Sequence, residues 1–376
     1  MKPKLAFVSQ WNAASPNAES GYPYSMRRQL QKRFEVVDLF PLALPGEHIW
    51  APIRAGYRLA GRYHHPMREP SILTRLARRI ERRLRTVKPD LVFAPSSVPM
   101  SFVETSCPWA YAADQLFCDF VDTYIGCPSA RFRRLGQEQE ARALTRAARA
   151  SFPSDWAAES AVRHYEVDRS KIAVIPWGAN LPHEIAEEDV AAAIARRPFD
   201  RCELVFIGRD WLRKGGDTLV ATVAELNREG LNAHATVIGC EPLGLPQGQF
   251  TTYRFLDKAN PQHFAKFARI MLDAHFLFLP SRAEAYGQAF CEAMAFGVPV
   301  ISSTVGGIPT IVREGQTGIL RPPETPAAEF ASLIREALAA PRRYREMARF
   351  AREDYRLRLN WDVFGQRLGD AIAALV

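Results

Sequence analysis

The stretch EAYGQAFCEAMAFGVPV (residues 284–300) places two carboxylates, Glu284 and Glu292, on either side of Gly287. It follows the apolar run HFLFLPS (275–281), which is typical of a buried strand. We expect a loop after this strand and a short helix that begins just after Gly287. One carboxylate then precedes the helix and the other lies inside its first turns.

The start of this helix has the chemistry of an anion site. The helix is expected to run from about residue 288 to 296, because Gly297 is a C-terminal stop signal. The N–H groups of Gly287, Gln288 and Ala289 would then have no backbone partner at the helix start. Together with the helix dipole, they form a site for phosphates.

Each carboxylate has a role beside such a phosphate site. Glu292 lies about one turn into the helix, where its carboxylate can accept both hydroxyls of a ribose. Glu284 lies in the preceding loop, where it can hold hydroxyls of a group attached to the terminal phosphate. Alternatively, Glu284 is a solvated loop residue and Glu292 a partner of the helix dipole.

A second strand supplies the complementary cations. In LVFIGRDWLRKGGDTLV (204–220), the strand ends at Gly208, and Arg209 and Lys214 follow. A guanidinium and an ammonium suit a diphosphate. Surface Arg and Lys are common, however, so this segment alone is weak evidence.

Apolar runs alternate with helical patterns along the whole chain, which is typical of parallel sheets covered by helices. The predicted strands are residues 5–9, 36–40, 91–94, 110–113, 150–153, 172–176, 204–208, 235–239, 253–256, 276–280, 298–302 and 318–320. The predicted helices are residues 24–32, 72–87, 134–148, 217–229, 261–272, 288–296 and 327–339. We therefore predict an α/β protein of two doubly wound, Rossmann-like domains.

Chain length and composition agree with this organisation. The chain has 376 residues, of which 47% are hydrophobic and 24% charged, as in globular proteins with two domains. It contains no run of about 18 apolar residues, so no membrane-spanning helix is expected. The apolar run near the N-terminus is too short for a signal peptide and favours a first strand.

The cysteines do not have the spacing of a metal site or a disulfide framework. None of the six forms a C-x-x-C pair, so we expect buried thiols in a reducing compartment. They are Cys107, Cys118, Cys127, Cys202, Cys240 and Cys291.

The motifs together resemble a known family. The 284–300 stretch is similar to the E-x7-E signature of retaining glycosyltransferases of family 4, which have the GT-B fold. The segment FIGRDWLRKGG (206–216) resembles their donor diphosphate motif. The resemblance spans nearly the whole chain and is strongest over residues 203–320.

This resemblance implies a domain arrangement and a reaction. An N-terminal domain (1–180, completed by a helix at 360–376) would bind the acceptor, and a C-terminal domain (181–359) would bind a nucleoside-diphosphate sugar across a cleft. The sugar would move to a glycan, lipid-linked or small-molecule acceptor with retained configuration. No cofactor and no metal are implied, since cations and the helix end can balance the leaving diphosphate.

The resemblance also implies the site residues. The implied catalytic residues are Glu284, Arg209, Lys214 and Asp114. The implied donor-binding residues are Gly208, Arg209, Lys214, Glu284, Gly287, Gln288, Ala289, Glu292 and Gly21. Gly21 stands alone where the family often has a glycine pair, and Asp114 follows WAYAA at a strand end, where a buried, hydrogen-bonded Asp is the alternative.

Residues 51–90 form a basic window that carries the whole net charge of +8. The window contains Arg54, Arg58, Arg62, Arg68, Arg75, Arg78, Arg79, Arg82, Arg83, Arg85 and Lys88. Residues 72–88 show one apolar stripe at helical spacing. The window is either the solvated back of a helix or a surface attracted to an anionic membrane. Nucleic acid is not expected, because no aromatic-rich basic groove accompanies the arginines.

These expectations describe a cytoplasmic enzyme of cell-envelope or polysaccharide biosynthesis, peripheral at the inner face of a membrane. Two alternatives remain open. One is a sugar-nucleotide epimerase or phosphorylase on the same architecture, and the other is a nucleotide-sugar-binding protein without turnover.

Overall fold

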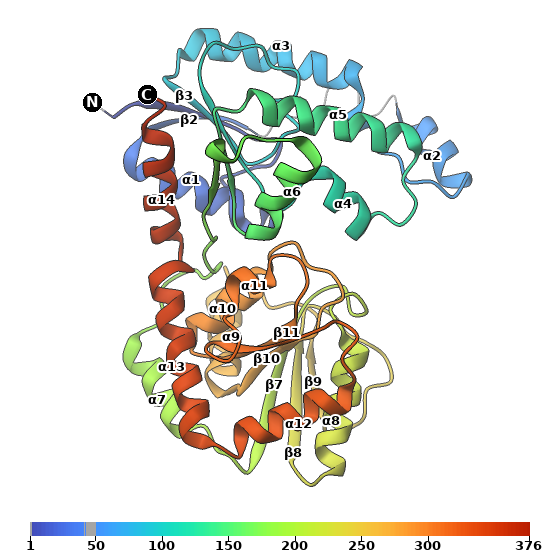
Figure 1. The fold of residues 1–376 in the computed structure, drawn as a ribbon, viewed down its shortest axis with the longest axis vertical. Coiled ribbons are helices and arrows are strands. Elements are labelled where there is room, and N and C mark those ends of the chain that lie inside the picture. Colours follow the sequence, from blue (N-terminus) through green and yellow to red (C-terminus); the bar gives the residue numbers. More distant parts are fainter. Residues whose placement is uncertain (1, 41, 43–49) are drawn as a thin grey trace. The chain divides into compact units, whose positions relative to one another are not determined.

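The computed structural model describes residues 2–40, 42 and 50–376, which fold into two compact units (Figure 1). Unit 1 consists of Met1–Trp177 and Trp361–Val376, and unit 2 consists of Gly178–Asn360. Each unit is a parallel six-stranded sheet with helices packed on it. The predicted α/β class with two doubly wound sheets is therefore confirmed.

The sheet of unit 1 has the order β2-β1-β3-β4-β5-β6. Its strands are β1 (Lys4–Val8), β2 (Glu35–Leu39), β3 (Leu91–Ala94), β4 (Trp109–Ala112), β5 (Arg149–Phe152) and β6 (Ile172–Val174). Its helices are α1 (Tyr22–Arg33), α2 (Ala51–Leu59), α3 (Pro70–Val87), α4 (Phe117–Tyr124), α5 (Ala130–Arg146), α6 (Asp155–Tyr165) and α14 (Trp361–Ala373). Short 3-10 turns lie at Ala18–Gly21, Pro66–Arg68 and Arg169–Lys171.

The sheet of unit 2 has the order β12-β11-β10-β7-β8-β9. Its strands are β7 (Arg201–Ile207), β8 (Asn232–Ile238), β9 (Phe250–Tyr253), β10 (Phe276–Leu279), β11 (Val300–Ser303) and β12 (Gly318–Arg321). Its helices are α7 (Glu187–Arg196), α8 (Gly216–Arg228), α9 (Pro261–Asp273), α10 (Gln288–Ala295), α11 (Ile308–Ile311), α12 (Ala327–Leu338) and α13 (Pro341–Arg358).

The central strands are apolar runs because helices cover both faces of a parallel sheet. All four residues of β10 and of β3 are buried, for example. The edge strand β9 differs, since each of its residues is only half-buried and two are threonine. The predicted strand at 253–256 is therefore wrong in position, because the apolar Leu256 lies after the strand rather than in it.

The last helix belongs to unit 1 because it packs on α1. Two glycines of α14 allow this close approach: a Cβ atom on Gly365 would lie 2.7 Å from Gln29, and one on Gly369 would lie 2.5 Å from Arg33. The side chain of Arg33 also donates to the Asp370 carboxylate at 2.6 Å. Thus α14 adds a helix to a sheet whose strands are far away in sequence.

The described residues also bear on two further expectations, the absence of a membrane-spanning helix and the burial of the thiols. Among the residues described, no helix is both long enough and apolar enough to cross a membrane. All six cysteines are free, but Cys127 is exposed and Cys107 and Cys240 are half-buried. The prediction that the thiols are buried is therefore wrong for Cys127, because this residue lies in the loop between α4 and α5 and not in a packed element.

Candidate functional site

The strand order of unit 2 predicts where a ligand binds. The chain runs outward from β7 through β8 to β9, and then returns to place β10 on the other side of β7. At such a switch point, the loops after the two neighbouring strands leave toward opposite faces of the sheet and open a crevice between them. Eight of the ten predicted site residues lie in the loops after β7 and β10 or in α10, the helix that follows the β10 loop.

A glycine in the loop after β7 allows this loop to lie close to the loop after β10. Gly215 has φ +79°, and a Cβ atom there would lie 2.3 Å from the carbonyl oxygen of Pro280. Only glycine therefore allows the two loops to touch at this point. Gly208 lies against the stem of Lys214, with its Cβ position 3.0 Å from Cγ of that lysine.

Further hydrogen bonds join the two loops. The N–H of Arg282 donates to the carbonyl of Arg213 at 2.8 Å, and Nη1 of Arg213 donates to the carbonyl of Ala283 at 2.7 Å. The guanidinium of Arg282 also holds the Asp217 carboxylate with two bonds, of 2.8 and 2.7 Å. The loops are thus fixed relative to each other.

This fixation brings Lys214 and Glu284 together as a buried ion pair. The ammonium of Lys214 donates to Oε2 of Glu284, and only 8% of either residue is exposed. Nη1 of Arg213 lies 4.0 Å from the same carboxylate oxygen. Two cations from the β7 loop therefore converge on the carboxylate that was predicted to hold the transferred sugar.

The loop after β11 also contacts the backbone of Glu284. Gly306 has φ +55°, and a Cβ atom there would lie 1.6 Å from the carbonyl oxygen of Glu284. The next residue, Gly307, donates its N–H to the carbonyl of Ala285 at 3.0 Å. The loop after β11 thus supports the loop that carries Glu284.

Helix α10 begins at the end of this loop, as the sequence predicts. Its N-cap, Gly287, has φ +93°, and the N–H of Phe290 makes a bond with the Gly287 carbonyl at 3.0 Å. The amides of Gln288 and Ala289 come before Phe290 in the sequence, at the N-terminal end of the helix, which favours anions. The side chain of Gln288 accepts from Nδ2 of Asn180 at 3.2 Å.

The second carboxylate, Glu292, also has a lysine partner. Glu292 is buried on α10, and its Oε1 accepts from the ammonium of Lys258, which precedes α9. The ammonium of Lys258 lies 5.6 Å from the centre of the Phe267 ring. Each carboxylate that flanks the helix start therefore has its own cation in the described structure.

Two residues of this cluster were not predicted from the sequence, and one predicted residue, Arg209, has no ion pair among the residues described. Arg213 and Lys258 were not predicted, although Arg213 directly precedes Lys214 in the sequence. Arg209 is exposed, and in the part of the chain described here it has no ion pair. Its predicted role at the diphosphate stays a prediction.

The other two predicted site residues lie in unit 1. Gly21 has φ +82° and is the N-cap of α1, directly before Tyr22. Burial raises the pKa of the Tyr22 hydroxyl, and the negative charges of Asp114 and Glu19 raise it further. The loops after β1 and β4 thus bring Gly21 and Asp114 close to the same tyrosine.

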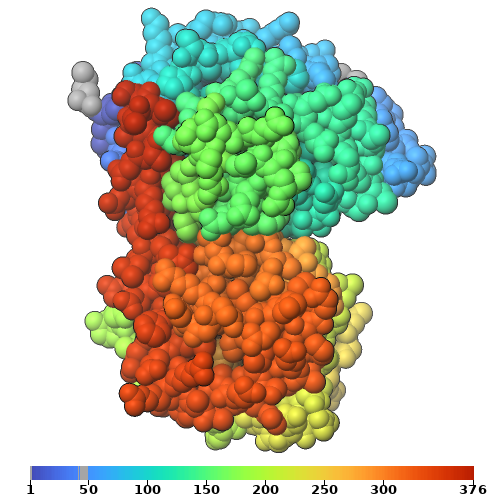
Figure 2. Space-filling view, in the orientation of Figure 1, coloured from blue at the N-terminus to red at the C-terminus, as the bar shows by residue number. Residues whose placement is uncertain are grey.

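The basic window divides into an exposed and a buried part. On α3, Leu76, Ile80 and other apolar residues are buried as predicted. The exposed basic residues of α3 and its C-cap are Arg75, Arg78, Arg79, Arg82, Arg83, Arg85 and Lys88. This segment lies at the surface of unit 1 in Figure 2, where α3 is light blue. Arg68 is instead buried, with its guanidinium 4.6 Å from the Phe117 ring and 3.7 Å from Glu140, so its inclusion in a surface patch is wrong.

Comparison with known families gives two matches that together cover most of the chain. The model of a family described as glycosyl transferases group 1 matches residues 201–340. The model described as glycosyltransferase family 4 matches residues 22–182.

Curated relatives and solved structures agree with these matches. A D-inositol 3-phosphate glycosyltransferase of Segniliparus rotundus is 36% identical over 200 residues, 50% of this chain and 43% of the relative. One from Streptomyces bingchenggensis is 30% identical over 65% of this chain and 56% of the relative. The chain spans about half the length of the curated relatives it matches.

Among solved structures, sucrose-phosphate synthase from Thermosynechococcus elongatus has a TM-score of 0.71 at 19% identity and covers 100% of this chain and 99% of its own. Alr3699/HepE of Anabaena, solved in complex with UDP, has a TM-score of 0.67 at 14% identity, with 100% of both chains covered. At these identities the likeness concerns the fold alone, and the predicted GT-B fold is confirmed.

Proposed function

The chain belongs to glycosyltransferase family 4, and from that membership we propose that it transfers a sugar from a nucleoside-diphosphate donor to a hydroxyl acceptor with retained anomeric configuration. The observation that carries this proposal is the arrangement around the start of α10. Two buried carboxylates, each paired with a lysine, lie before and inside that helix. We assign the donor to unit 2 and the acceptor to unit 1.

The donor would be held by groups of three kinds. The amides of Gln288 and Ala289 and the cations of the β7 loop would bind the diphosphate. Glu292 would accept the ribose hydroxyls, and Glu284 would accept hydroxyls of the transferred sugar. With these roles, the donor would extend along the start of α10, with its nucleoside beside Glu292 and its sugar beside Glu284.

The ion pairs suit this assignment because they hold the carboxylates in position before the donor arrives. Lys214 is held against Glu284, which lies in the loop that precedes α10. Arg213 adds a second cation at 4.0 Å from the same carboxylate. When a diphosphate binds, Lys214 can share its remaining N–H donors with a phosphate oxygen, since an ammonium has three.

The proposed chemistry is substitution on one face of the sugar. The bond from the anomeric carbon to the diphosphate oxygen breaks, and a bond to the acceptor oxygen forms on the same face. The acceptor proton passes to the departing diphosphate oxygen. Lys214, Arg209 and the amides of α10 would stabilise the charge that develops on that group, so we propose that no metal is needed.

The names of the relatives suggest which substrates to test first. The curated relatives are D-inositol 3-phosphate glycosyltransferases, and one structural neighbour was solved with UDP-glucose. We propose a UDP-sugar as the first donor and a phosphorylated cyclitol as the first small-molecule acceptor. Glycan and lipid-linked acceptors form the second group.

We also propose that unit 1 contacts an anionic membrane surface through α3. Its outward-facing arginines are exposed, and its apolar stripe is buried against the sheet. Each basic residue close to an anionic surface contributes about 1 kcal/mol. Such attraction would place the enzyme at the membrane while no part of α3 enters the apolar interior.

The proposal is tested with the purified chain and a panel of UDP-, GDP-, ADP- and dTDP-sugars. A bound donor raises the melting temperature by mass action. The donor that gives the largest shift is then incubated with each acceptor, and the product's anomeric configuration is determined by NMR. We expect retention and a rate that does not depend on added Mg²⁺ or Mn²⁺. An inverted product, or no shift and no product with any donor, would refute the proposal; free epimerised donor formed without acceptor would favour the epimerase alternative.

A further inference from the structure

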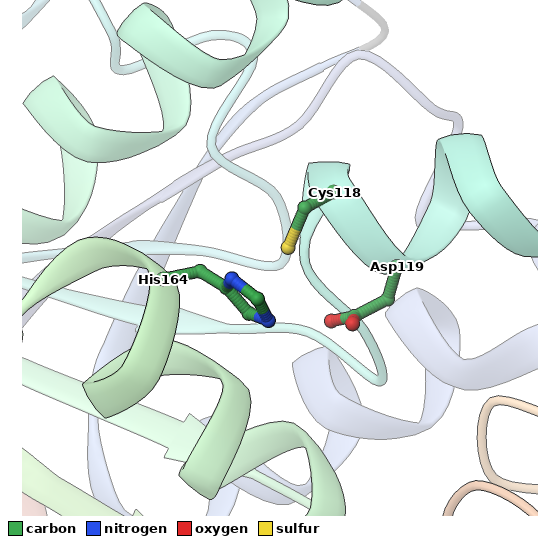
Figure 3. Close-up of side chains that lie close together, drawn as sticks. All are labelled: Cys118, Asp119 and His164. Atoms are coloured by element: carbon green, nitrogen blue, oxygen red, sulfur yellow. The ribbon is translucent and has the colours of Figure 1, made fainter.

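Three side chains of metal-ligating type lie close together in unit 1 (Figure 3). Cys118 and Asp119 lie in the first turn of α4, and His164 lies in the last turn of α6. One ligand atom from each residue lies within 4.8 Å of the other two. In the close-up, the thiol, the carboxylate and the imidazole point toward a common centre.

Local hydrogen bonds explain why consecutive residues of α4 face the same point. The Asp119 carboxylate turns back to accept from the amide of Leu116 at 3.4 Å. It also accepts from the hydroxyl of Ser160, on α6, at 2.7 Å. The same hydroxyl lies 3.7 Å from Sγ of Cys118. Ser160 thus fixes both α4 side chains relative to the helix that carries His164.

The charges around the cluster are not balanced by protein cations. In the described residues, the half-buried carboxylate of Asp119 has no ion pair. The nearby guanidinium of Arg68 lies 3.7 Å from the Glu140 carboxylate, so that pair is neutral by itself. A dication bound by a thiolate and the Asp119 carboxylate would bring the local charge to zero.

The ligand types and their spacing select among metals. A thiolate, an imidazole and a carboxylate are the three ligand types that zinc accepts, whereas Mg²⁺ and Ca²⁺ prefer oxygen alone. Zinc bond lengths place tetrahedral ligand atoms about 3.4–3.6 Å apart. The three ligand atoms, which lie within 4.8 Å of one another, would have to move closer to reach that spacing, and the exposed His164 side chain has room to move. A carboxylate that is already oriented by a hydroxyl is typical of such sites.

We propose that Cys118, Asp119 and His164 bind one Zn²⁺, with water at the fourth position, and that the ion clamps α4 to α6. The segment that leads into α4 carries Asp114, so the clamp would also hold the loop after β4. This inference does not depend on the proposed transfer reaction, and it adds a structural metal to a chain for which the sequence predicted none.

The test measures zinc binding to the purified full chain after chelation and dialysis. Calorimetric titration with Zn²⁺ should give one site per chain, and Zn²⁺ should raise the melting temperature. Substitution with Co²⁺ should give a thiolate-to-metal charge-transfer band in the near ultraviolet. Cys118→Ser should remove that band, and His164→Ala should weaken zinc binding about tenfold or more.

Controls separate this site from adventitious binding. Cys127→Ser changes an exposed thiol outside the cluster and should bind zinc as the wild type does. His164→Ala alters an exposed side chain, so its fold, checked by circular dichroism, should be intact. Zinc binding that is absent from the wild type, or unchanged in both Cys118→Ser and His164→Ala, would overturn the proposal. None of these readouts uses glycosyl transfer.

Discussion

The ammonium of Lys214, in the loop after β7, is paired with the carboxylate of Glu284, in the loop after β10. The two residues are 70 positions apart, and neither lies in a helix or strand. They meet because β7 and β10 are neighbours in the sheet and their loops leave the same edge. The ion pair therefore depends on the same arrangement of loops that the proposed donor site needs.

Removing one partner of this pair should destabilise unit 2 more than removing both. Lys214→Met leaves a buried carboxylate and Glu284→Gln leaves a buried ammonium, and each should lower the free energy of unfolding by roughly 3 kcal/mol. The double variant should recover most of that loss. Urea denaturation of all four proteins measures the coupling. Losses that simply add would show that the two side chains do not interact.

Glu292 should act on the nucleoside and not on the diphosphate. Glu292→Gln should weaken binding of a nucleoside diphosphate about tenfold to a hundredfold, because bonds to a charged acceptor contribute roughly 1.5–3 kcal/mol. Titration calorimetry gives the dissociation constants. A 2′,3′-dideoxy nucleoside diphosphate is the matched control, since it lacks the ribose hydroxyls. It should bind both proteins equally, and an equal weakening for both ligands would contradict the assignment.

Gly306 should be needed for the position of Glu284. In Gly306→Ala, the new methyl would meet the Glu284 carbonyl, whereas Gly315→Ala has the same left-handed backbone and open space around it. Both variants should lose about 1 kcal/mol from the positive φ. Gly306→Ala should lose a further 1–3 kcal/mol or so from overpacking. It should also lower kcat at least tenfold, while Gly315→Ala keeps its kcat.

The sequence predicted where the β7 loop and helix α10 begin, because these signals are local. Gly287 as the start of α10, and Gly208 at the end of β7, follow from the order of apolar runs and glycines. The ion pairs were not predictable, since Lys258 and Glu292 meet only through tertiary folding. Sequence spacing had likewise given no reason to connect Cys118 with His164, which belong to different helices.

Helices without a clean apolar stripe were also missed. The helix α2 has no buried residue. The helix α13 buries Tyr344, Met347, Ala351 and Tyr355 at helical spacing, but the many arginines between them mask this stripe in the sequence. The sequence also did not show which arginines of the basic window are exposed at the surface and which are buried. Arg68 has the same charge as its neighbours in sequence, but its 3-10 turn directs it into the protein.

The exposed arginines of α3 should bind vesicles that contain anionic lipid. Replacing Arg75, Arg78 and Arg82 with glutamine should weaken binding about a hundredfold at moderate salt, at roughly 1 kcal/mol for each residue. Cosedimentation with phosphatidylglycerol-containing vesicles measures the effect, and pure phosphatidylcholine vesicles should bind neither protein.

A control for net charge comes from unit 2. Replacing the exposed Arg342, Arg343 and Arg349 of α13 with glutamine changes the net charge by the same amount. This variant should keep vesicle affinity. If both triple variants lose affinity equally, the attraction depends on overall charge and α3 has no special role.

His275 should make unit 2 sensitive to acid. It is fully buried before β10, where Nε2 lies 2.6 Å from the carbonyl of Pro198 and Nδ1 accepts from the N–H of Glu203 at 3.0 Å. A proton on Nδ1 would face that N–H. Burial lowers the pKa of His275, and the nearby charge of Arg197 lowers it further, against the opposing effects of the Pro198 carbonyl and Glu203.

Because the folded-state pKa of His275 is lowered, the unfolded chain binds the proton more tightly. The neutral ring therefore stabilises the fold above the unfolded pKa of about 6.5. That stability is lost as the pH falls from there toward the lowered value, by up to about 1.4 kcal/mol per pH unit. Urea denaturation from pH 7.5 to 5 should show this loss in the wild type and in His263→Gln, whose histidine is exposed. In His275→Gln, the free energy of unfolding should fall less steeply with decreasing pH, by that amount. An unchanged slope would show that the pKa of His275 is the same in the folded and unfolded chain.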